Sequence, residues 1–191
     1  MPQKILLVDN NDSFTFNIVE LIRSVKGEKP VILKGSSFKK PELHDFKSII
    51  FSPGPGLPSD FPLMKKILSE AGGLVPILGI CLGHQAICEF YGSKLLNLNV
   101  VVHGQSKKIS ISGDSPLFKG LPSGFNVGLY HSWVVENSSV NENITITSVS
   151  DEGQIMSVED KSKKILGVQF HPESYITQFG KEIMNNFLEI R

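Results

Sequence analysis

Cysteine is scarce in this sequence, with only Cys81 and Cys88 among 191 residues. Two cysteines do not suggest the disulfide framework of a small secreted protein. The sequence also contains no Cys-x-x-Cys, no His-Glu-x-x-His and no tight cluster of His and Asp, so we expect no metal site. A reducing, cytoplasmic compartment is therefore the expected location, and it suits a reactive thiol.

An excess of charge of either sign is also missing, because 19 Lys and Arg balance 19 Asp and Glu. This balance gives no electrostatic footprint for nucleic acid or for an anionic membrane, so we expect neither as a partner. The longest nearly apolar run, 74–83, is far too short to span a membrane. Only four apolar residues separate Lys4 from Asp9, which is too few for the core of a secretory signal.

The length of the sequence and its alternation of apolar and helical segments predict one α/β domain, residues 1–191. The sequence shows no repeat, low-complexity tract or linker. In the first half, apolar runs alternate with helical patterns, and Asp12 or Ser13 is a plausible cap for the first helix. We expect strands at 4–8, 31–33, 48–51 and 75–78, and helices at 14–24, 63–69 and 84–91. Continuous apolar strands separated by helices predict a doubly wound, mostly parallel sheet flanked by helices.

The second half changes character, because its strands follow one another with only short turns between them. We expect these strands at 107–112, 144–150, 154–158 and 165–170, and a closing helix at 178–190. Strands joined by short turns indicate an antiparallel section added to the parallel sheet.

A candidate nucleophile lies between a predicted strand and a predicted helix, in Gly79-Ile80-Cys81-Leu82-Gly83. This is the pattern of a nucleophile elbow, with cysteine in place of serine in G-x-S-x-G. The glycines let the backbone turn sharply, and the following helix start favours a thiolate. The Leu82 amide then points to where an oxyanion would form. On this motif alone Cys81 could equally be a buried structural cysteine; Cys88, two helical turns later, is interpreted as a core residue.

A candidate base lies at the end of the last predicted strand, where His171 and Pro172 precede Glu173. Histidine is the usual base for a cysteine nucleophile near neutral pH. Residues i and i+2 of an extended chain project to one side, so Glu173 can orient the imidazole of His171. A surface histidine beside a turn proline is the alternative. The remaining histidines lack a comparable strand-end position beside a carboxylate: His44, His84, His103 and His131.

A loop rich in proline and glycine, SPGPGLP at 52–58, follows another predicted strand. Prolines stiffen such a loop and glycines let its amides approach a substrate closely, although a plain rigid turn is the alternative. It is not a P-loop, because no Gly-Lys-Ser/Thr follows, and the turn at 9–13 has no glycine for a dinucleotide. We therefore expect no cofactor in this chain.

Six segments together resemble the class I, triad-type glutamine amidotransferases, in particular the small subunits of anthranilate synthase and aminodeoxychorismate synthase. They span nearly the whole chain in family order: DNNDSFTFN (9–17), SPGPGLP (52–58), GICLGHQAI (79–87), HG (103–104), YHS (130–132) and QFHPES (169–174). The resemblance implies a nucleophile at Cys81, a base at His171 and an orienting carboxylate at Glu173.

The resemblance also implies the rest of a glutamine site. It assigns the oxyanion hole to the amides of Gly54 and Leu82, a glutamine contact to Gln85, and the substrate's amino-acid end to the backbone around Ser132 and Trp133. Pro55 and Gly56 belong to the same predicted substrate-binding loop as Gly54. We interpret segment 9–17 as a turn and helix cap, although the family segment shapes the active face.

The expected reaction converts glutamine and water into glutamate and ammonia. This chain shows no nucleotide loop or acidic metal cluster, so the resemblance implies a chorismate-using synthase partner that takes up ammonia and alone carries Mg²⁺. Leu129 and Trp133 depart from the family pattern, where a basic residue and a leucine are common. A cysteine hydrolase of γ-glutamyl peptides and a non-catalytic docking subunit remain alternatives. The choice between the anthranilate and aminodeoxychorismate pathways stays open.

Overall fold

The protein is described by a computed structural model covering residues 4–37, 39, 41–71 and 73–191, and these residues form one nine-stranded sheet. Five neighbouring strands are parallel, in the order β2 (Val31–Lys34), β1 (Lys4–Asp9), β3 (Phe46–Phe51), β4 (Ile77–Ile80) and β9 (Ile165–Val168). Antiparallel strands continue the sheet from β9: β8 (Ile155–Asp160), β7 (Thr145–Ser150), β5 (Leu95–Ile111) and β6 (Gly124–Val135). The predicted α/β class with an added antiparallel section is confirmed.

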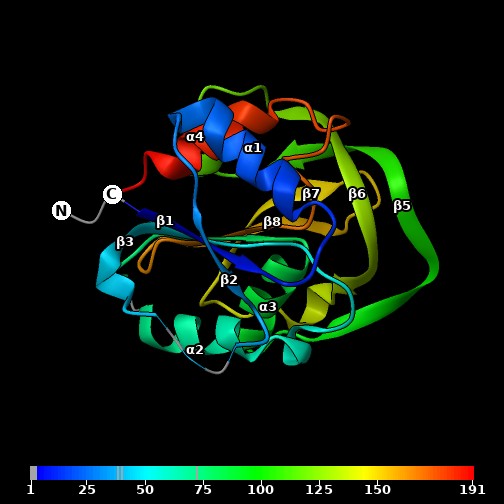
Figure 1. The fold of residues 1–191 in the computed structure, drawn as a ribbon. Coiled ribbons are helices and arrows are strands. Elements are labelled where there is room, and N and C mark those ends of the chain that lie inside the picture. Colours follow the sequence, from blue (N-terminus) through cyan, green and yellow to red (C-terminus); the bar gives the residue numbers. More distant parts are fainter. Residues whose placement is uncertain (1–3, 38, 40, 72) are drawn as a thin grey trace.

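Helices cover both faces of the sheet (Figure 1). Helices α1 (Thr15–Lys26) and α4 (Gly180–Leu188) lie on one face, and α2 (Pro62–Ala71) and α3 (Leu82–Phe90) lie on the other. Short 3-10 turns occur at Leu43–Asp45, Pro58–Asp60, Pro116–Phe118 and Asn137–Ser139. A hydrophobic core lies on each face of the sheet, and strand β1 contributes to both. Ile5 and Leu7 pack toward α1 and α4, and Leu6 and Val8 pack toward α2. A strand buried on both faces has no polar alternation, which is why it reads as a continuous apolar run.

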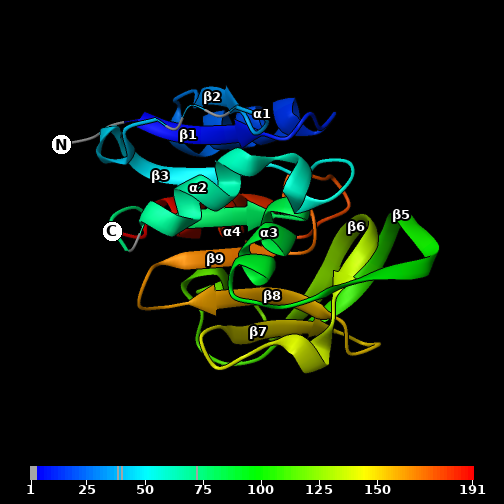
Figure 2. The same ribbon diagram turned by 90° about the horizontal axis from the view of Figure 1, so that it is seen from below.

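The ribbon of β5 and β6 is longer than the single strand that the sequence predicts at 107–112, because β5 begins at Leu95 and all of β6 is additional. Figure 2 shows the ribbon leaning away from the rest of the sheet. Most of β5 is exposed or half-buried, and Leu96, Val100 and Val101 are exposed hydrophobic residues. Bulges interrupt its pairing with β6 between Asn97 and Val102. Without one consistently buried face, such a strand carries no regular period-two pattern to detect.

The cap predicted for the first helix was only partly right. Helix α1 begins at Thr15 and its N-cap residue is Phe14, with no side-chain cap bond. The Asp12 carboxylate instead accepts the Phe14 amide at 2.7 Å, which closes the turn before the helix. Ser13 is not the N-cap residue. No helix among the residues described is long and apolar enough to cross a membrane.

Candidate active site

Cys81 occupies a strained turn between β4 and α3, with φ 51° and ψ −100°. A positive φ in a residue other than glycine costs on the order of 1–3 kcal/mol and persists only where surrounding structure holds it. The Cys81 amide donates to the Val168 carbonyl at 2.8 Å, and its own carbonyl accepts from the Gln85 amide at 3.0 Å. These bonds fix the turn from both sides, and Cys81 is only 5% exposed.

The two glycines flanking Cys81 are required by close packing. A Cβ atom on Gly79 would lie 2.4 Å from the carbonyl carbon and oxygen of Gly83. A Cβ atom on Gly83 would lie 2.6 Å from Cβ and 2.7 Å from the carbonyl oxygen of Phe51, in β3. Larger residues would push the start of α3 away from the sheet. The sharp turn from β4 into α3 at Cys81, with a glycine two residues away on each side, confirms the predicted elbow geometry.

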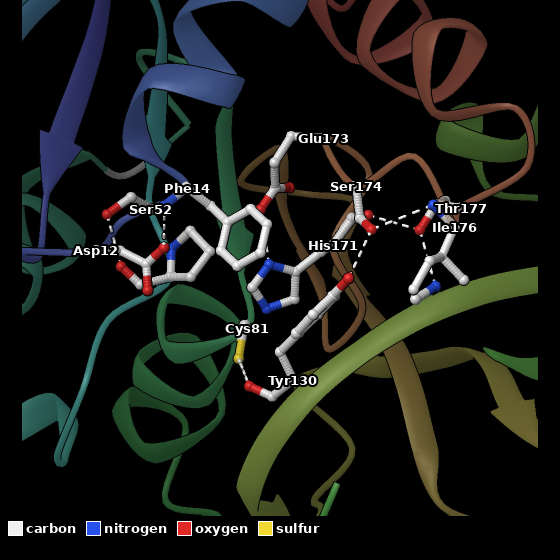
Figure 3. A network of polar contacts seen from close by, with 12 residues as sticks. Asp12, Phe14, Ser52, Cys81, Tyr130, His171, Glu173, Ser174, Ile176 and Thr177 are labelled. Carbon is white, nitrogen blue, oxygen red and sulfur yellow. Dashed lines mark hydrogen bonds and ion pairs between the residues drawn. The ribbon is translucent and has the colours of Figure 1, made fainter. Parts of the chain in front are cut away.

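His171 lies beyond the end of β9, and its amide donates to the Gly128 carbonyl of β6 at 3.1 Å. Its Nδ1 atom is 2.6 Å from Oε1 of Glu173, and the side chains are 2% and 0% exposed. Figure 3 shows the other side of the ring facing the Cys81 sulfur. Burial by itself would lower the pKa of His171, but the Glu173 carboxylate and Cys81 raise it well above its ordinary value. The arrangement therefore favours a charged imidazolium beside the sulfur.

The other histidines are less suited to act as the base. His84 is fully buried on α3, and burial lowers its pKa to about 3. Burial and the neighbouring charge of His171 lower the pKa of His131 to about 4. His103 packs edge-on against Tyr130 with ring centroids 5.2 Å apart, and the side chain of His44 is largely exposed. Among the described histidines, His171 alone combines a carboxylate within 3 Å, burial and proximity to the sulfur.

Cys88 differs from Cys81 in its neighbours, because no carboxylate-bound imidazole in the described part of the chain faces its sulfur. It is fully buried in the core between the sheet and α2. Burial raises the pKa of the Cys88 thiol, which keeps it in its neutral, unreactive form. Its predicted role as a core residue is confirmed.

Two aromatic rings pack against the imidazole, and neither is among the predicted site residues. The Phe14 and Tyr130 ring centroids lie 5.3 Å and 4.9 Å from that of His171. The Tyr130 hydroxyl is hydrogen-bonded to Oγ of Ser174 at 3.0 Å. Thr177 Oγ1 donates to the His171 carbonyl at 2.6 Å and accepts the Gly128 amide at 2.9 Å. The turn that carries His171 is therefore fastened to β6 (Figure 3).

The segment after β1 shapes the active face, contrary to our preferred interpretation of it as only a turn and helix cap. The Asn10 amide donates to Ser52 Oγ at 2.9 Å, and its side-chain amide donates to the Ser52 carbonyl at 2.8 Å. A Cβ atom on Gly54 would lie 2.7 Å from both the Asn10 carbonyl oxygen and Cδ2 of Leu82. The loop is thus pressed against the start of α3, where the Leu82 amide has no acceptor within the helix. Pro55 and Gly56 are exposed on the same loop.

The remaining predicted site residues meet on the other side of Cys81. Nε2 of Gln85 donates to the Trp133 carbonyl at 2.8 Å, which places the backbone of β6 at the site. Ser132 and Trp133 are half-buried on that strand. Leu129 lies on the same strand but is 1% exposed and packs in the core. A basic residue would be unfavourable in this apolar environment, so the surroundings of Leu129 match the residue that this chain carries.

The fold and this geometry place a buried thiol, an imidazole and a carboxylate together at one edge of an α/β sheet, with Cys81 directly after β4 and His171 and Glu173 beyond the end of the adjacent parallel strand β9. The chain matches the glutamine amidotransferase class-I family over residues 6–190, and it belongs to that family.

Two relatives and one solved structure illustrate the similarity. A Haemophilus influenzae protein provisionally named anthranilate synthase component II is 43% identical over 187 residues, covering 98% of this chain and 96% of its own. The Bacillus subtilis aminodeoxychorismate/anthranilate synthase component 2 is 35% identical, covering 97% and 95%. A crystal structure from Thermoplasma acidophilum, provisionally named as part of a GMP synthase, has a TM-score of 0.86 at 27% identity, covering 98% and 93%. The chain therefore matches these three proteins over nearly their full length.

Proposed function

We propose that this glutamine amidotransferase hydrolyses L-glutamine through Cys81, His171 and Glu173 and delivers the ammonia to a chorismate-using synthase subunit. One observation carries the proposal. His171 is held by Glu173 through Nδ1 at 2.6 Å, while the opposite side of its ring faces the sulfur of the strained Cys81 (Figure 3). This is the relation of nucleophile, base and orienting carboxylate that acyl transfer requires.

In the proposed mechanism the Cys81 thiolate attacks the side-chain carbonyl carbon of glutamine, and a carbon–sulfur bond forms. The amides of Leu82 and Gly54 donate to the resulting oxyanion. The imidazolium of His171 gives its proton to the amide nitrogen as the carbon–nitrogen bond breaks, which releases ammonia. His171 then takes a proton from water, the water oxygen attacks the thioester, and glutamate leaves with restoration of the thiolate. These steps use only groups of this chain, so no cofactor enters the proposal.

Substrate recognition is proposed for the opposite end of the site. Gln85 and the backbone at Ser132 and Trp133 would hold the α-amino and α-carboxylate groups of glutamine. Gly54 would approach the reacting amide through the loop that also carries Pro55 and Gly56. Cys81 and His171 are only 5% and 1% exposed, so movement of neighbouring segments would open the site further to glutamine. A partner that moves these segments would couple glutamine hydrolysis to the use of ammonia.

The proposed partner is the component I synthase implied by the names of the component 2 relatives, and Mg²⁺ would be carried only by that partner. The Bacillus subtilis relative is named for both the aminodeoxychorismate and the anthranilate reaction. We propose a complex of this kind in the cytoplasm, where a working thiol stays reduced. Association with the partner should raise the glutaminase activity of this chain.

The Cys81→Ser variant tests the proposal in the complex with the co-purifying synthase subunit. A hydroxyl is far less acidic than a thiol, so formation of the aminated chorismate product with glutamine should fall to background. Ammonium salt at mildly alkaline pH should restore product formation, because only the ammonia supply is removed. Cys88→Ala is the matched control and should keep glutamine-dependent activity.

Each contrary result has a distinct meaning. Glutamine-dependent activity retained by Cys81→Ser would show that Cys81 is not the nucleophile. Loss of both activities in a complex that remains assembled would count against ammonia delivery. Turnover of γ-glutamyl peptides, without any effect on a synthase, would favour the cysteine-hydrolase alternative.

A further inference from the structure

A buried chain of side-chain amides leads from β6 to the sulfur of Cys81. Nε2 of Gln85 donates to the Trp133 carbonyl at 2.8 Å and to Oε1 of Gln169 at 3.2 Å. Nε2 of Gln169 donates in turn to Sγ of Cys81 at 3.5 Å. Gln85 is 3% exposed and Gln169 is fully buried.

The direction of these bonds follows from the backbone. The Trp133 carbonyl can only accept, so the group of Gln85 that faces it must be the NH₂ group. That same NH₂ group faces Gln169, which must therefore present its carbonyl oxygen. The NH₂ group of Gln169 is left pointing at the sulfur. One backbone carbonyl thus determines the orientation of both amides.

The backbone of Gln169 is also fixed by the sheet. It follows directly after β9, and its backbone amide donates to the Met156 carbonyl of β8 at 2.9 Å. Full burial leaves its side chain no competing hydrogen bond to solvent. A donor fixed in this way loses little freedom when the sulfur becomes charged, which makes its stabilisation of a thiolate effective.

We infer that Gln169 is a positioning residue that stabilises the Cys81 thiolate through its side-chain N–H and is aimed by Gln85. The inference rests on the proposed function of Cys81 and deepens it. Gln85 then has two functions, because both N–H groups serve this chain of bonds and only its carbonyl oxygen remains for the substrate. Changes at the substrate end of the site would reach the sulfur through Gln169.

The test replaces Gln169 with Met, which has a similar length and no N–H donor. Gln154→Met, in the half-buried turn between β7 and β8, is the matched control. The rate of Cys81 alkylation by iodoacetamide is measured as a function of pH, with peptide mapping to exclude Cys88. Glutamate release from glutamine is measured in the complex with the co-purifying synthase.

The pH profile must be interpreted with the titratable groups near the sulfur in mind. They are His171 and Glu173 after β9 and Tyr130 and His131 on β6, whereas His84 on α3 contacts Cys88 instead. None of them is changed by Gln169→Met, so a shift relative to wild type reports the lost donor.

Hydrogen bonds to charged groups are among the stronger ones, so loss of this donor should destabilise the thiolate. We expect the pH midpoint of Cys81 alkylation in Gln169→Met to move up by about one pH unit. The kcat for glutamate release should fall roughly tenfold, with a smaller change in KM. Gln154→Met should match wild type. If Gln169→Met does not fold, Gln169→Asn keeps a neutral amide that is one methylene shorter and withdraws the donor from the sulfur, and it should shift the midpoint in the same direction.

Two results would overturn different claims. An unchanged midpoint and unchanged kcat in folded Gln169 variants would refute the inference and leave the proposed function intact. Failure of a glutamine-analogue electrophile to label Cys81 in the wild-type protein would refute the proposed function itself.

Discussion

Replacing Gly83 with Ala tests how strictly the packing around the elbow controls the chemistry. Alanine is the better helix former and would by itself favour α3 by about 1 kcal/mol. Its Cβ atom, however, would lie 2.6 Å from Cβ and 2.7 Å from the carbonyl oxygen of Phe51. Ordinary contacts lie near 3.5–4.0 Å, so α3 must retreat by about 1 Å. Phe51 belongs to the buried strand β3, and its Cβ cannot rotate away.

The expected cost of this overpacking is about 1–3 kcal/mol in the free energy of unfolding. A loss of 2 kcal/mol would lower Tm by roughly 4–8 °C in a chain of this size. A displacement of about 1 Å at the Leu82 amide should reduce glutamine turnover on the order of a hundredfold.

Gly153→Ala is the control, because its φ of +78° imposes strain but no atom lies within 4 Å of the added Cβ. It should lose about 1–2 kcal/mol of stability and keep full turnover. Melting curves and glutamine-dependent kinetics of both variants decide the matter, with ammonium-dependent synthesis as a check that the complex is assembled. Wild-type turnover in Gly83→Ala would refute the claim that this close approach places the oxyanion donor.

Two further substitutions test the environment of His171. Glu173→Gln keeps an acceptor for Nδ1 but removes the charge, so the pKa of His171 should fall and glutamine turnover should drop by about 10²–10⁴-fold. The pKa of His171 is higher in the folded protein than in the unfolded chain, where it is about 6.5. The stabilisation that this group contributes is therefore complete at pH values below the unfolded-state pKa, and it is lost as the pH rises through the folded-state pKa. The stability difference between wild type and Glu173→Gln should therefore be largest at mildly acidic pH; an NMR titration with an unmoved His171 pKa would contradict this. Thr177→Val removes the hydroxyl that bonds the Gly128 amide and the His171 carbonyl, and it should lower the free energy of unfolding in urea by about 2–4 kcal/mol. Thr145→Val, at an exposed position, is the control and should change this free energy little. Equal stabilities of the two variants would contradict the role of Thr177 in holding the turn.

The parallel half of the fold was predictable because strands that are buried on both faces consist largely of consecutive apolar residues. Each of the strands β1, β3, β4 and β9 contains a short run of apolar residues and glycine. The elbow at Cys81 was likewise visible, since close backbone approach requires glycine at Gly79 and Gly83. Such local requirements can be read from neighbouring residues alone.

The contacts that complete the site were not predictable in the same way, because they join distant parts of the chain. Asn10 binds Ser52 across 42 positions, and Gln169 binds Cys81 across 88. Gln169 stood within the recognised QFHPES segment, but its role depends on the direction in which Gln85 and Trp133 orient it. Phe14 carries no polar group at all, and only the folded arrangement places its ring against His171.

The relative placement of nucleophile and base follows from the pairing of two strands. Ile80 pairs with Val168 in the parallel register of β4 and β9. One residue beyond Ile80 is Cys81, whose amide bonds the Val168 carbonyl, and three residues beyond Val168 is His171. The bond that holds the strained backbone of Cys81 is therefore the one that sets its distance from His171. A slip in this register would disrupt both the support of the turn and the approach of the imidazole, so the core that holds β4 against β9 also maintains the catalytic geometry we propose.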